Sequence, residues 1–367
     1  MLPKYLDFYF NFLRCFGICL ETPNMTERSK FLIYFWAISL LFFIPIMGVW
    51  AILSMKISHL NETLIFVQII LVYSATFSIV LETFLAKNHQ FRFWKLIEKL
   101  EYSMSETQNL IPEYRSFSCS TKRRILICFA YSVAIECFVV AMHKVYESRF
   151  DSIRWSIGWL VYYYFIAIGR MQNHNHILVI QILKMHAKFF NEDLRRTGRV
   201  LMNSTNQNVA KELNLIKFRH AYLWEAVETA NKCNRWSQFF NIIQNFFLFT
   251  SAFYWAYIFV RIPNFFNVFK CIISTVPSIV DTAYLCHESQ TLQEEAGKTG
   301  SILQGFLTNY TNRLHHFTKN CIVELCLQMH HEKIRIVIGG IFTLNMAFLT
   351  VFAGTIVTYL VIILQNF

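Results

Sequence analysis

Residues 336–367, IVIGGIFTLNMAFLTVFAGTIVTYLVIILQNF, contain no charged side chain. A bilayer core of about 30 Å is crossed by about 20 apolar residues of α-helix, so this stretch is long enough to span a membrane. Similar apolar runs recur along the chain and predict an all-α polytopic membrane protein with seven transmembrane helices. The predicted spans lie near residues 31–53, 62–86, 124–146, 155–177, 238–260, 267–286 and 340–365.

The composition excludes a water-soluble domain. Hydrophobic residues make up 55% of the 367 residues and charged residues only 16%, a balance too apolar for a soluble protein of this length. The net charge of +11 would suggest nucleic acid as the partner of a soluble protein, but here the basic residues gather on one predicted side of the membrane. We therefore expect them to set the topology in the bilayer and to face anionic lipid, with no nucleic-acid partner.

Lysine and arginine alternate between the gaps that separate the predicted spans. Most of the 34 lie in the N-terminal tail and in the second, fourth and sixth gaps. Because cytoplasmic loops retain positive charge during insertion, this pattern predicts a cytoplasmic N-terminus and an extracellular C-terminus. A seven-transmembrane G-protein-coupled receptor has the opposite orientation.

The gaps on the predicted inner side are long and helical in pattern. From Ile177 to Leu194, apolar residues recur at three- and four-residue spacing with charges opposite them, which predicts that the fourth helix continues beyond the membrane. The predicted cytoplasmic helical segments lie near residues 178–198, 209–235 and 289–335. They would form a bundle beneath the membrane, and since no Pro/Gly/Ser-rich linker interrupts the chain we expect one domain over residues 1–367.

Motifs for catalysis, metal or cofactor binding are weak. The sequence GKTGS at residues 297–301 lacks the glycine that a phosphate-binding loop has five residues before its Gly-Lys pair, because Leu292 stands there. Among the histidines and cysteines of residues 315–331, Cys326 and His330 are the one pair suitably spaced for zinc, which needs four ligands. We therefore expect no enzyme, no metal and no cofactor.

Four ionisable residues lie within predicted spans, where an unpaired charge is expensive. They are Glu82, Glu136, Arg170 and Asp281. Glu82, Arg170 and Asp281 fall in the inner halves of their helices, so we expect charge pairing among these three. A structural pairing and a role in transport or ligand contact both remain open.

Aromatic and polar residues gather in the outer halves of two predicted spans, each set at helical spacing. These residues are Trp159, Tyr162 and Tyr163 on the fourth span and Thr250, Tyr254 and Tyr257 on the fifth. Tyrosine and tryptophan are enriched at membrane interfaces as anchors. They also form the walls of ligand pockets, where a buried hydroxyl needs a partner. Both interpretations stay open, the second being a ligand pocket that opens to the outside.

The last predicted helix contains a weakly polar stripe. Thr355, Thr358, Ile362 and Gln365 fall three, four and three residues apart on an otherwise apolar helix. Such a stripe is typical of a pore-lining helix shared among identical subunits. Small polar residues that pack helices together would give the same pattern, and composition alone does not separate the two.

The ending TYLVIILQNF resembles the Thr-Tyr, five hydrophobics, Gln-Phe signature that closes the last helix of insect gustatory receptors. Thr358, Tyr359 and Gln365 match it, and residues 360–364 supply the hydrophobics. Asn366 stands where the family has phenylalanine, which follows one position later as Phe367. The stretch HAYLWEAVETANKCNRWSQFF resembles the His-Leu-Asn-Phe helix that precedes the family's fifth span.

This resemblance implies a taste receptor of the plasma membrane that acts as a ligand-gated, nonselective cation channel opened by a small extracellular tastant. It also implies a homo- or heterotetramer with the seventh helices around a central pore. By position, Gln365 would lie at the outer constriction, while Thr358 and Tyr359 would support the helix and its contacts. Ile362 would help to keep the closed pore dry. The inserted Asn366 turns Phe367 by about 100° around the helix, which is expected to alter closure or conductance.

Other functions remain open at this point. An odorant-receptor-type subunit would share the architecture and need a co-receptor. A G-protein-coupled receptor is opposed by the charge orientation. A transporter or integral-membrane enzyme would need converging groups, for which Glu136 and His143 are the best pair. The aromatic walls favour apolar or aromatic, bitter-type ligands over sugars, whose hydroxyls would require more hydrogen-bonding groups.

Overall fold

The computed structural model describes residues 2–18, 22, 25–53, 60–105, 111–146, 153–200, 206–262, 265–310 and 316–365. Apart from one short hairpin, the regular elements in these ranges are helices. They are η1 (Leu2–Leu6), α1 (Asp7–Arg14), α2 (Glu27–Leu53), α3 (Leu60–Leu85), α4 (Lys87–Ser105), α5 (Ile111–Tyr146), α6 (Ile153–Val200), α7 (Asn206–Cys233), α8 (Arg235–Arg261), α9 (Phe265–Tyr310), α10 (His316–His331) and α11 (Met346–Gln365). The hairpin consists of β1 (Val337–Ile338) and β2 (Phe342–Thr343).

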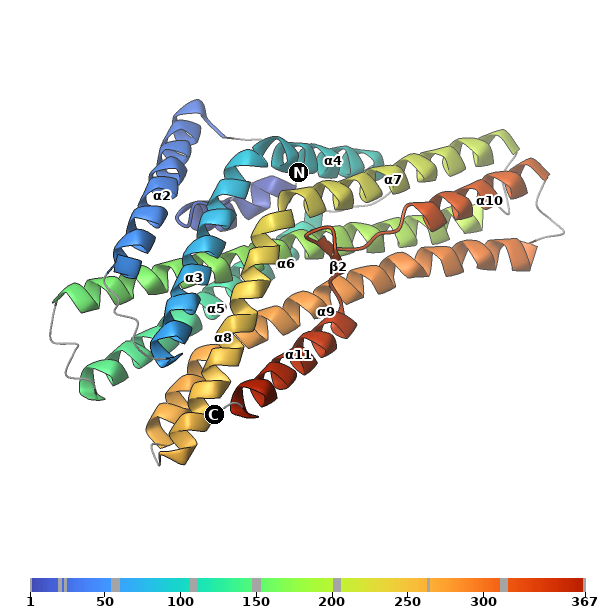
Figure 1. The fold of residues 1–367 in the computed structure, drawn as a ribbon. Helices are drawn as coiled ribbons and strands as arrows, with labels where there is room; N and C mark the ends of the chain where they lie inside the picture. Colours follow the sequence, from blue (N-terminus) through green and yellow to red (C-terminus); the bar gives the residue numbers. More distant parts are fainter. Residues whose placement is uncertain are drawn as a thin grey trace.

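The helices form two parts that share α6 and α9 (Figure 1). In the first part, α2, α3, α5, α8 and α11 pack with one another and with the first halves of α6 and α9. In the second, α7 and α10 lie along the second halves of α6 and α9, which extend to the upper right of the view, and α4 packs on α7. One cluster of buried hydrophobic residues runs from Leu2 to Leu344 through both parts. The two parts therefore share a single core.

Helices α6 and α9 are long because they belong to both parts. They contain 48 and 46 residues, which at 1.5 Å per residue makes each about 70 Å long. A bilayer core of about 30 Å accommodates less than half of that length. The continuous helix from Ile153 to Val200 joins the predicted span 155–177 to the predicted segment 178–198 without a break. The placement of that second segment in the cytoplasm stays a prediction.

Six helices in the described part of the chain are long and apolar enough to cross a membrane, namely α2, α3, α5, α8, α9 and α11. They contain six of the seven predicted spans, and the predicted all-α polytopic fold is confirmed. The remaining predicted span, 155–177, lies in α6. Its second half is polar because it includes Arg170, Gln172, Asn173, His174 and His176. All five are buried against other helices, so protein rather than lipid surrounds them.

The structure differs from the sequence prediction just before the last helix. The predicted span 340–365 begins within the hairpin, in which Val337 pairs with Thr343 and Ile338 with Phe342. The turn is possible because Gly339 and Gly340 adopt positive φ angles of 64° and 76°, which cost glycine little. The predicted segment 289–335 is also divided, since α9 ends at Tyr310 and α10 begins at His316.

Helix α11 has a well-defined start after the hairpin. The Oδ1 atom of Asn345 accepts a hydrogen bond of 2.8 Å from the backbone N–H of Phe348, as an N-cap side chain does. This cap satisfies a backbone donor that has no partner within the helix. The apolar helix that was predicted to line a pore therefore begins at Met346 and ends at Gln365.

Candidate ligand site and pore helix

The three aromatic residues predicted on the fourth span form a cluster on α6. The ring centroid of Trp159 lies 5.6 Å from that of Tyr162 and 5.4 Å from that of Tyr163. The centroids of the two tyrosine rings are 5.9 Å apart. All three side chains are half-buried, so the cluster combines apolar ring faces with polar edges that can donate or accept hydrogen bonds.

Gln68 of α3 connects this cluster to α8. Its Nε2 donates a hydrogen bond of 3.0 Å to the hydroxyl of Tyr162, and its Oε1 accepts one of 3.4 Å from the hydroxyl of Ser251. Ser251 follows Thr250, one of the residues predicted to contact ligand. Sequence reasoning missed Gln68, although it is the only amide side chain in the predicted span 62–86. Side chains of three helices therefore meet at this point.

The predicted residues on α8 have different surroundings. Tyr254 is only 3% exposed, and its ring centroid is 5.8 Å from that of Trp255. Tyr257 is half-buried, and the guanidinium of Arg261 lies 4.8 Å from its ring centroid, a cation–π distance. The Thr250 hydroxyl donates to the carbonyl oxygen of Phe246 in its own helix at 2.8 Å. Gln68 thus links Tyr162 of one predicted set to Ser251, the residue that follows Thr250 of the other.

Arg170 lies further along α6 and forms an ion pair across to α5. Its Nη1 is 2.8 Å from Oε1 of Glu136 and also donates to the hydroxyl of Ser132. His174, one turn further along α6, has its Nε2 atom 3.6 Å from Oδ1 of Asp281 on α9. The expected pairing of Arg170 with Glu82 or Asp281 is therefore wrong, because α5 supplies the partner.

Glu82 has a different role from the one its position suggested. Its two carboxylate oxygens accept hydrogen bonds of 2.8 Å and 2.6 Å from the backbone N–H groups of Trp236 and Ser237. These donors lie in the first turn of α8, where backbone N–H groups lack partners within the helix and a negative charge is favourable. Glu82 therefore fixes the start of α8 against α3.

An amide network joins α6 to the start of α8. Gln172 donates to Asn234 at 2.9 Å, while Asn173 accepts from Gln238 at 2.9 Å and from Asn241 at 2.8 Å. These five side chains are buried. Because polar groups on α6 are matched by polar groups on α8, the two helices can pack together within a largely apolar layer.

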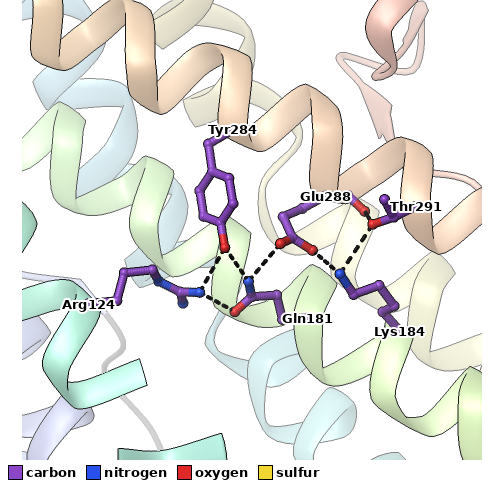
Figure 2. A network of polar contacts seen from close by, with 6 residues as sticks. All are labelled: Arg124, Gln181, Lys184, Tyr284, Glu288 and Thr291. Atoms are coloured by element: carbon purple, nitrogen blue, oxygen red, sulfur yellow. Dashed lines mark hydrogen bonds and ion pairs between the residues drawn. The ribbon is translucent and has the colours of Figure 1, made fainter. Parts of the chain in front are cut away.

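A second polar network, which we call the inner polar network because it lies toward the predicted cytoplasmic side, fixes α6 against α5 and α9 (Figure 2). It consists of Arg124 on α5, Gln181 and Lys184 on α6, and Tyr284, Glu288 and Thr291 on α9. Gln181 is at its centre. Its Oε1 accepts from Nη1 of Arg124 at 2.6 Å, and its Nε2 donates to the Tyr284 hydroxyl at 2.8 Å and to Glu288 at 3.0 Å.

The same network also contains an ion pair between α6 and α9. Lys184 contacts Oε2 of Glu288 and also donates to the hydroxyl of Thr291 at 3.2 Å. Arg124 donates to the Tyr284 hydroxyl at 3.1 Å as well. Lys184 and Glu288 are therefore both paired and hydrogen-bonded, as charged groups with limited access to water require.

Helix α9 also positions the start of α11. The backbone oxygen of Leu344 accepts hydrogen bonds from Ser289 at 2.7 Å and from Gln293 at 3.1 Å. Gln290 accepts from the backbone N–H of Met346 at 3.2 Å. Because Ser289 directly follows Glu288, the inner polar network and the anchor of α11 share the same turns of α9.

One side of α11 packs against α8. Phe352 and Ile356 are buried in a small cluster with Phe249, and the ring of Phe246 lies 5.6 Å from that of Tyr359. These contacts hold α11 through its apolar side. On the opposite side of the helix, Val351 and Val357 are exposed.

The predicted pore residues fall largely on that open side. Thr358, Ile362 and Gln365 are exposed, whereas Thr355 is half-buried. The hydroxyls of Thr355 and Thr358 donate to backbone oxygens one turn earlier at 2.8 Å and 2.9 Å. Tyr359 is half exposed, at 50%, beside α8, while Phe367 lies outside the residues that the structure describes.

Comparison with known protein families covers nearly the whole chain. Residues 6–366 match the model of the 7tm Chemosensory receptor family. The chain belongs to this family. The match confirms the predicted family resemblance at the level of chemosensory receptors, which are not a family of enzymes. No curated protein sequence matches the chain.

Solved structures with the same fold include an insect receptor. The receptor chain is similar to the insect olfactory receptor OR5 from Machilis hrabei with a TM-score of 0.65 and 14% identity, over 100% of this chain and 99% of that one. For the same olfactory receptor in complex with eugenol the TM-score is 0.58 and the identity 12%, with coverage of 100% and 99%. At such identities the similarity shows the fold.

Within the receptor, α8 connects the predicted ligand residues to the predicted pore helix. Ser251 contacts Gln68 on one side of α8, and Phe249 packs against α11 on another. Side chains of α8 therefore contact both Gln68, which bonds Tyr162 of the aromatic cluster, and α11.

Proposed function

We propose that this receptor is a gustatory-type, ligand-gated, nonselective cation channel of the plasma membrane, opened from outside by a small tastant. The observation that supports it most is the arrangement of α11. This uncharged helix uses Phe352 and Ile356 to pack on α8 and leaves Thr358, Ile362 and Gln365 exposed on its other side. A tetramer, of this chain alone or with sister subunits, would place four such sides around a central pore.

The proposed ligand site lies around Trp159, Tyr162 and Tyr163 on α6 and Thr250, Tyr254 and Tyr257 on α8. The aromatic rings offer apolar contact area, and Gln68 and Ser251 supply hydrogen-bonding groups. This composition suits a small apolar or aromatic molecule with a single polar group. The related olfactory receptor in complex with eugenol supports a small-molecule ligand here.

In this proposal, gating follows from a difference in ligand affinity between the closed and the open arrangement of the channel. A ligand shifts the balance toward the open form only as far as it binds that form more tightly. A molecule that enters between α6 and α8 would move α8, and the contact between Phe249 and Phe352 would transmit this movement to α11. Ile362 and neighbouring apolar side chains would keep the closed pore free of water.

Whole-cell current from cells that express this chain alone tests the proposal. Gln365→Ala and Gln365→Arg are expected to change rectification or block of a cation current evoked by a panel of small ligands. Gln304→Arg is the matched control, because Gln304 is exposed on α9 and outside the proposed pore. A ligand-evoked current with the same rectification and block in all four proteins would show that α11 does not line the pore.

An odorant-receptor-type subunit is the second candidate, favoured by the fold shared with the olfactory receptor. Such a subunit would reach the cell surface but conduct only together with a co-receptor. Silence of this chain alone, followed by current on co-expression, would support that function. Silence in both cases would instead favour a G-protein-coupled receptor or a transporter.

A further inference from the structure

The N-terminal segment η1–α1 lies along the first half of α5. The backbone oxygen of Tyr5 accepts a hydrogen bond from the hydroxyl of Ser118, and the ring centroids of Phe12 and Phe129 are 5.1 Å apart. The side of the segment that faces the protein is packed into the core. Its buried residues are Leu2, Leu6, Tyr9, Phe10 and Leu13. The segment is therefore a fixed part of the fold, and its outward side belongs to the same surface as α5.

That outward side combines basic residues with an exposed aromatic ring. Phe8 is 41% exposed, and the Nζ of Lys122 lies 4.5 Å from its ring centroid. We call the surface made by Lys4, Phe8, Arg115, Lys122 and Arg123, all of them exposed, the α1–α5 face. Its acidic neighbours are Asp7 and Glu113, so the surface has a net positive charge.

The exposed residues of α5 show at which depth this face lies. Up to Arg123 they are mostly polar or charged, whereas Leu126, Ile127 and Tyr131 are 41%, 57% and 47% exposed. Exposed apolar side chains in a membrane-spanning helix face hydrocarbon, and charged ones lie outside it. The boundary of the hydrocarbon therefore falls between Arg123 and Leu126, and the α1–α5 face lies at the depth of lipid headgroups.

Two further helices hold the far end of α1. The backbone oxygen of Cys15 accepts hydrogen bonds from Nε1 of Trp36 on α2 at 3.2 Å and from the hydroxyl of Tyr164 on α6 at 3.0 Å. Because these contacts fix α1 beside α5, the position of Phe8 relative to Lys122 is set by the fold.

From this arrangement we infer that the α1–α5 face binds anionic phospholipid. The basic side chains contact the phosphate and carboxylate of the headgroups, and the ring of Phe8 inserts at the boundary with the acyl chains. With the predicted cytoplasmic N-terminus the face meets the inner leaflet, where anionic lipid attracts clusters of basic residues close to transmembrane helices. The inference does not depend on whether the receptor conducts ions.

Lipid retention by the purified full-length receptor tests this inference. The receptor in detergent is incubated with equal amounts of phosphatidylserine and phosphatidylcholine and purified again, and the bound lipid is counted by mass spectrometry. We expect phosphatidylserine to be enriched at least about five-fold over phosphatidylcholine. The triple variant Arg115→Gln, Lys122→Gln, Arg123→Gln should lose this enrichment.

A matched triple variant removes the same charge elsewhere. Lys188, Arg195 and Lys298 are exposed on the second halves of α6 and α9, so changing all three to glutamine should leave the enrichment intact. Phe8→Gln changes no charge and should lower the total lipid retained. Thermal unfolding in phosphatidylcholine alone checks that each variant is folded.

The possible outcomes distinguish a site for lipid headgroups from a site for soluble anions. Equal retention of the two lipids by the unmodified receptor, or equal loss in both triple variants, would overturn the inference. If excess inorganic phosphate displaces phosphatidylserine, the face is a site for soluble anions and the lipid assignment fails. Persistence of the enrichment in phosphate, with loss only in the α5 variant, supports a lipid surface.

Discussion

The ring of Phe249 on α8 meets the ring of Phe352 on α11 edge to face, with their centroids 6.1 Å apart. Two residues further along α8, Ser251 contacts Gln68 of α3. Residues two apart in an α-helix point about 200° away from each other. A single turn of α8 therefore touches the proposed ligand region on one side and the proposed pore helix on the other, as the proposed gating mechanism requires.

Removing either ring of this contact should weaken the hold of α8 on α11. We expect Phe249→Ala and Phe352→Ala each to lower the unfolding temperature of the purified receptor and to raise the current without ligand. In membranes such packing replaces the hydrophobic effect as the force between helices. The free energy of unfolding lost in the double variant should be smaller than the sum of the losses in the two single variants, by about 0.5–1.5 kcal/mol.

Phe42→Ala serves as the control for this pair. Phe42 is 69% exposed on α2, so its removal should change stability and basal current little. Strict additivity of the Phe249 and Phe352 effects would mean that the two rings do not act on each other.

The hydroxyl of Tyr162 should matter for ligand response through Gln68. Tyr162→Phe removes the acceptor of the 3.0 Å hydrogen bond and leaves the amide of Gln68 without that partner. We expect the ligand concentration for half-maximal current to rise about 5- to 10-fold, which corresponds to about 1 kcal/mol. Tyr131→Phe is the control, because Tyr131 is exposed on α5. Unchanged potency in Tyr162→Phe would remove this residue from the ligand site.

The sequence predicted the helices well because each span depends on local composition. Apolar runs of sufficient length identify membrane helices whatever their neighbours are. Helical periodicity likewise predicted that the helix of the fourth span continues well past residue 177, as α6 does. The hairpin at Gly339 and Gly340 was missed because it lies inside an apolar run, where hydropathy does not distinguish strand and turn from helix. Its signal was the adjacent pair of glycines.

Contacts between helices were predicted less well. The position of Arg170 in its span indicated a need for a partner but not which helix supplies it, and the partner is Glu136 on α5. Gln68 was missed for the same reason, since a lone amide in an apolar span acquires meaning only when Tyr162 and Ser251 are seen beside it. The side of α11 that packs on α8 also depends on the partner helix.

The cap of α11 should affect both stability and gating. Asn345→Ala removes the side-chain acceptor for the Phe348 N–H, which typically costs about 0.5–2 kcal/mol. We expect a lower unfolding temperature and an altered basal current, because α11 would fray at the end that α9 anchors. Asn345→Asp retains the acceptor and should restore both. Failure of Asn345→Asp to improve on Asn345→Ala would argue against a capping role.

Two lysine–glutamate pairs, one inside the inner polar network and one outside it, differ in how deeply they are buried. Lys184 and Glu288 are 32% and 7% exposed, and both have further hydrogen-bond partners. Lys298, paired with Glu295, is 55% exposed. We expect Lys184→Gln to destabilise the receptor by about 1–2 kcal/mol, because it leaves a largely buried carboxylate without its cation. Lys298→Gln should cost less than about 1 kcal/mol. Thermal unfolding in detergent measures both, and equal effects would contradict the role of burial.

A buried histidine in the second part of the molecule predicts a loss of stability in acid. The side chain of His220 on α7 is 4% exposed, and its Nδ1 lies 3.1 Å from Oε2 of Glu332. Burial lowers the pKa of His220, and the charge of Glu332 opposes this shift only in part. The folded receptor therefore keeps the imidazole neutral at a pH at which the unfolded chain, with a pKa of about 6.5, already binds a proton.

The sign of the effect follows from proton linkage. This contribution to stability is complete above about pH 6.5 and is lost as the pH falls toward the lower pKa of the folded state, by at most about 1.4 kcal/mol per pH unit. We expect the unfolding temperature of the receptor to fall between about pH 7 and pH 5.5 and the slope to be smaller in His220→Gln. His316→Gln, a change of an exposed histidine at the start of α10, should leave the slope unchanged. If His220→Gln and the unmodified receptor have the same slope, the acid sensitivity arises from other groups and His220 is already protonated or solvated in the folded state.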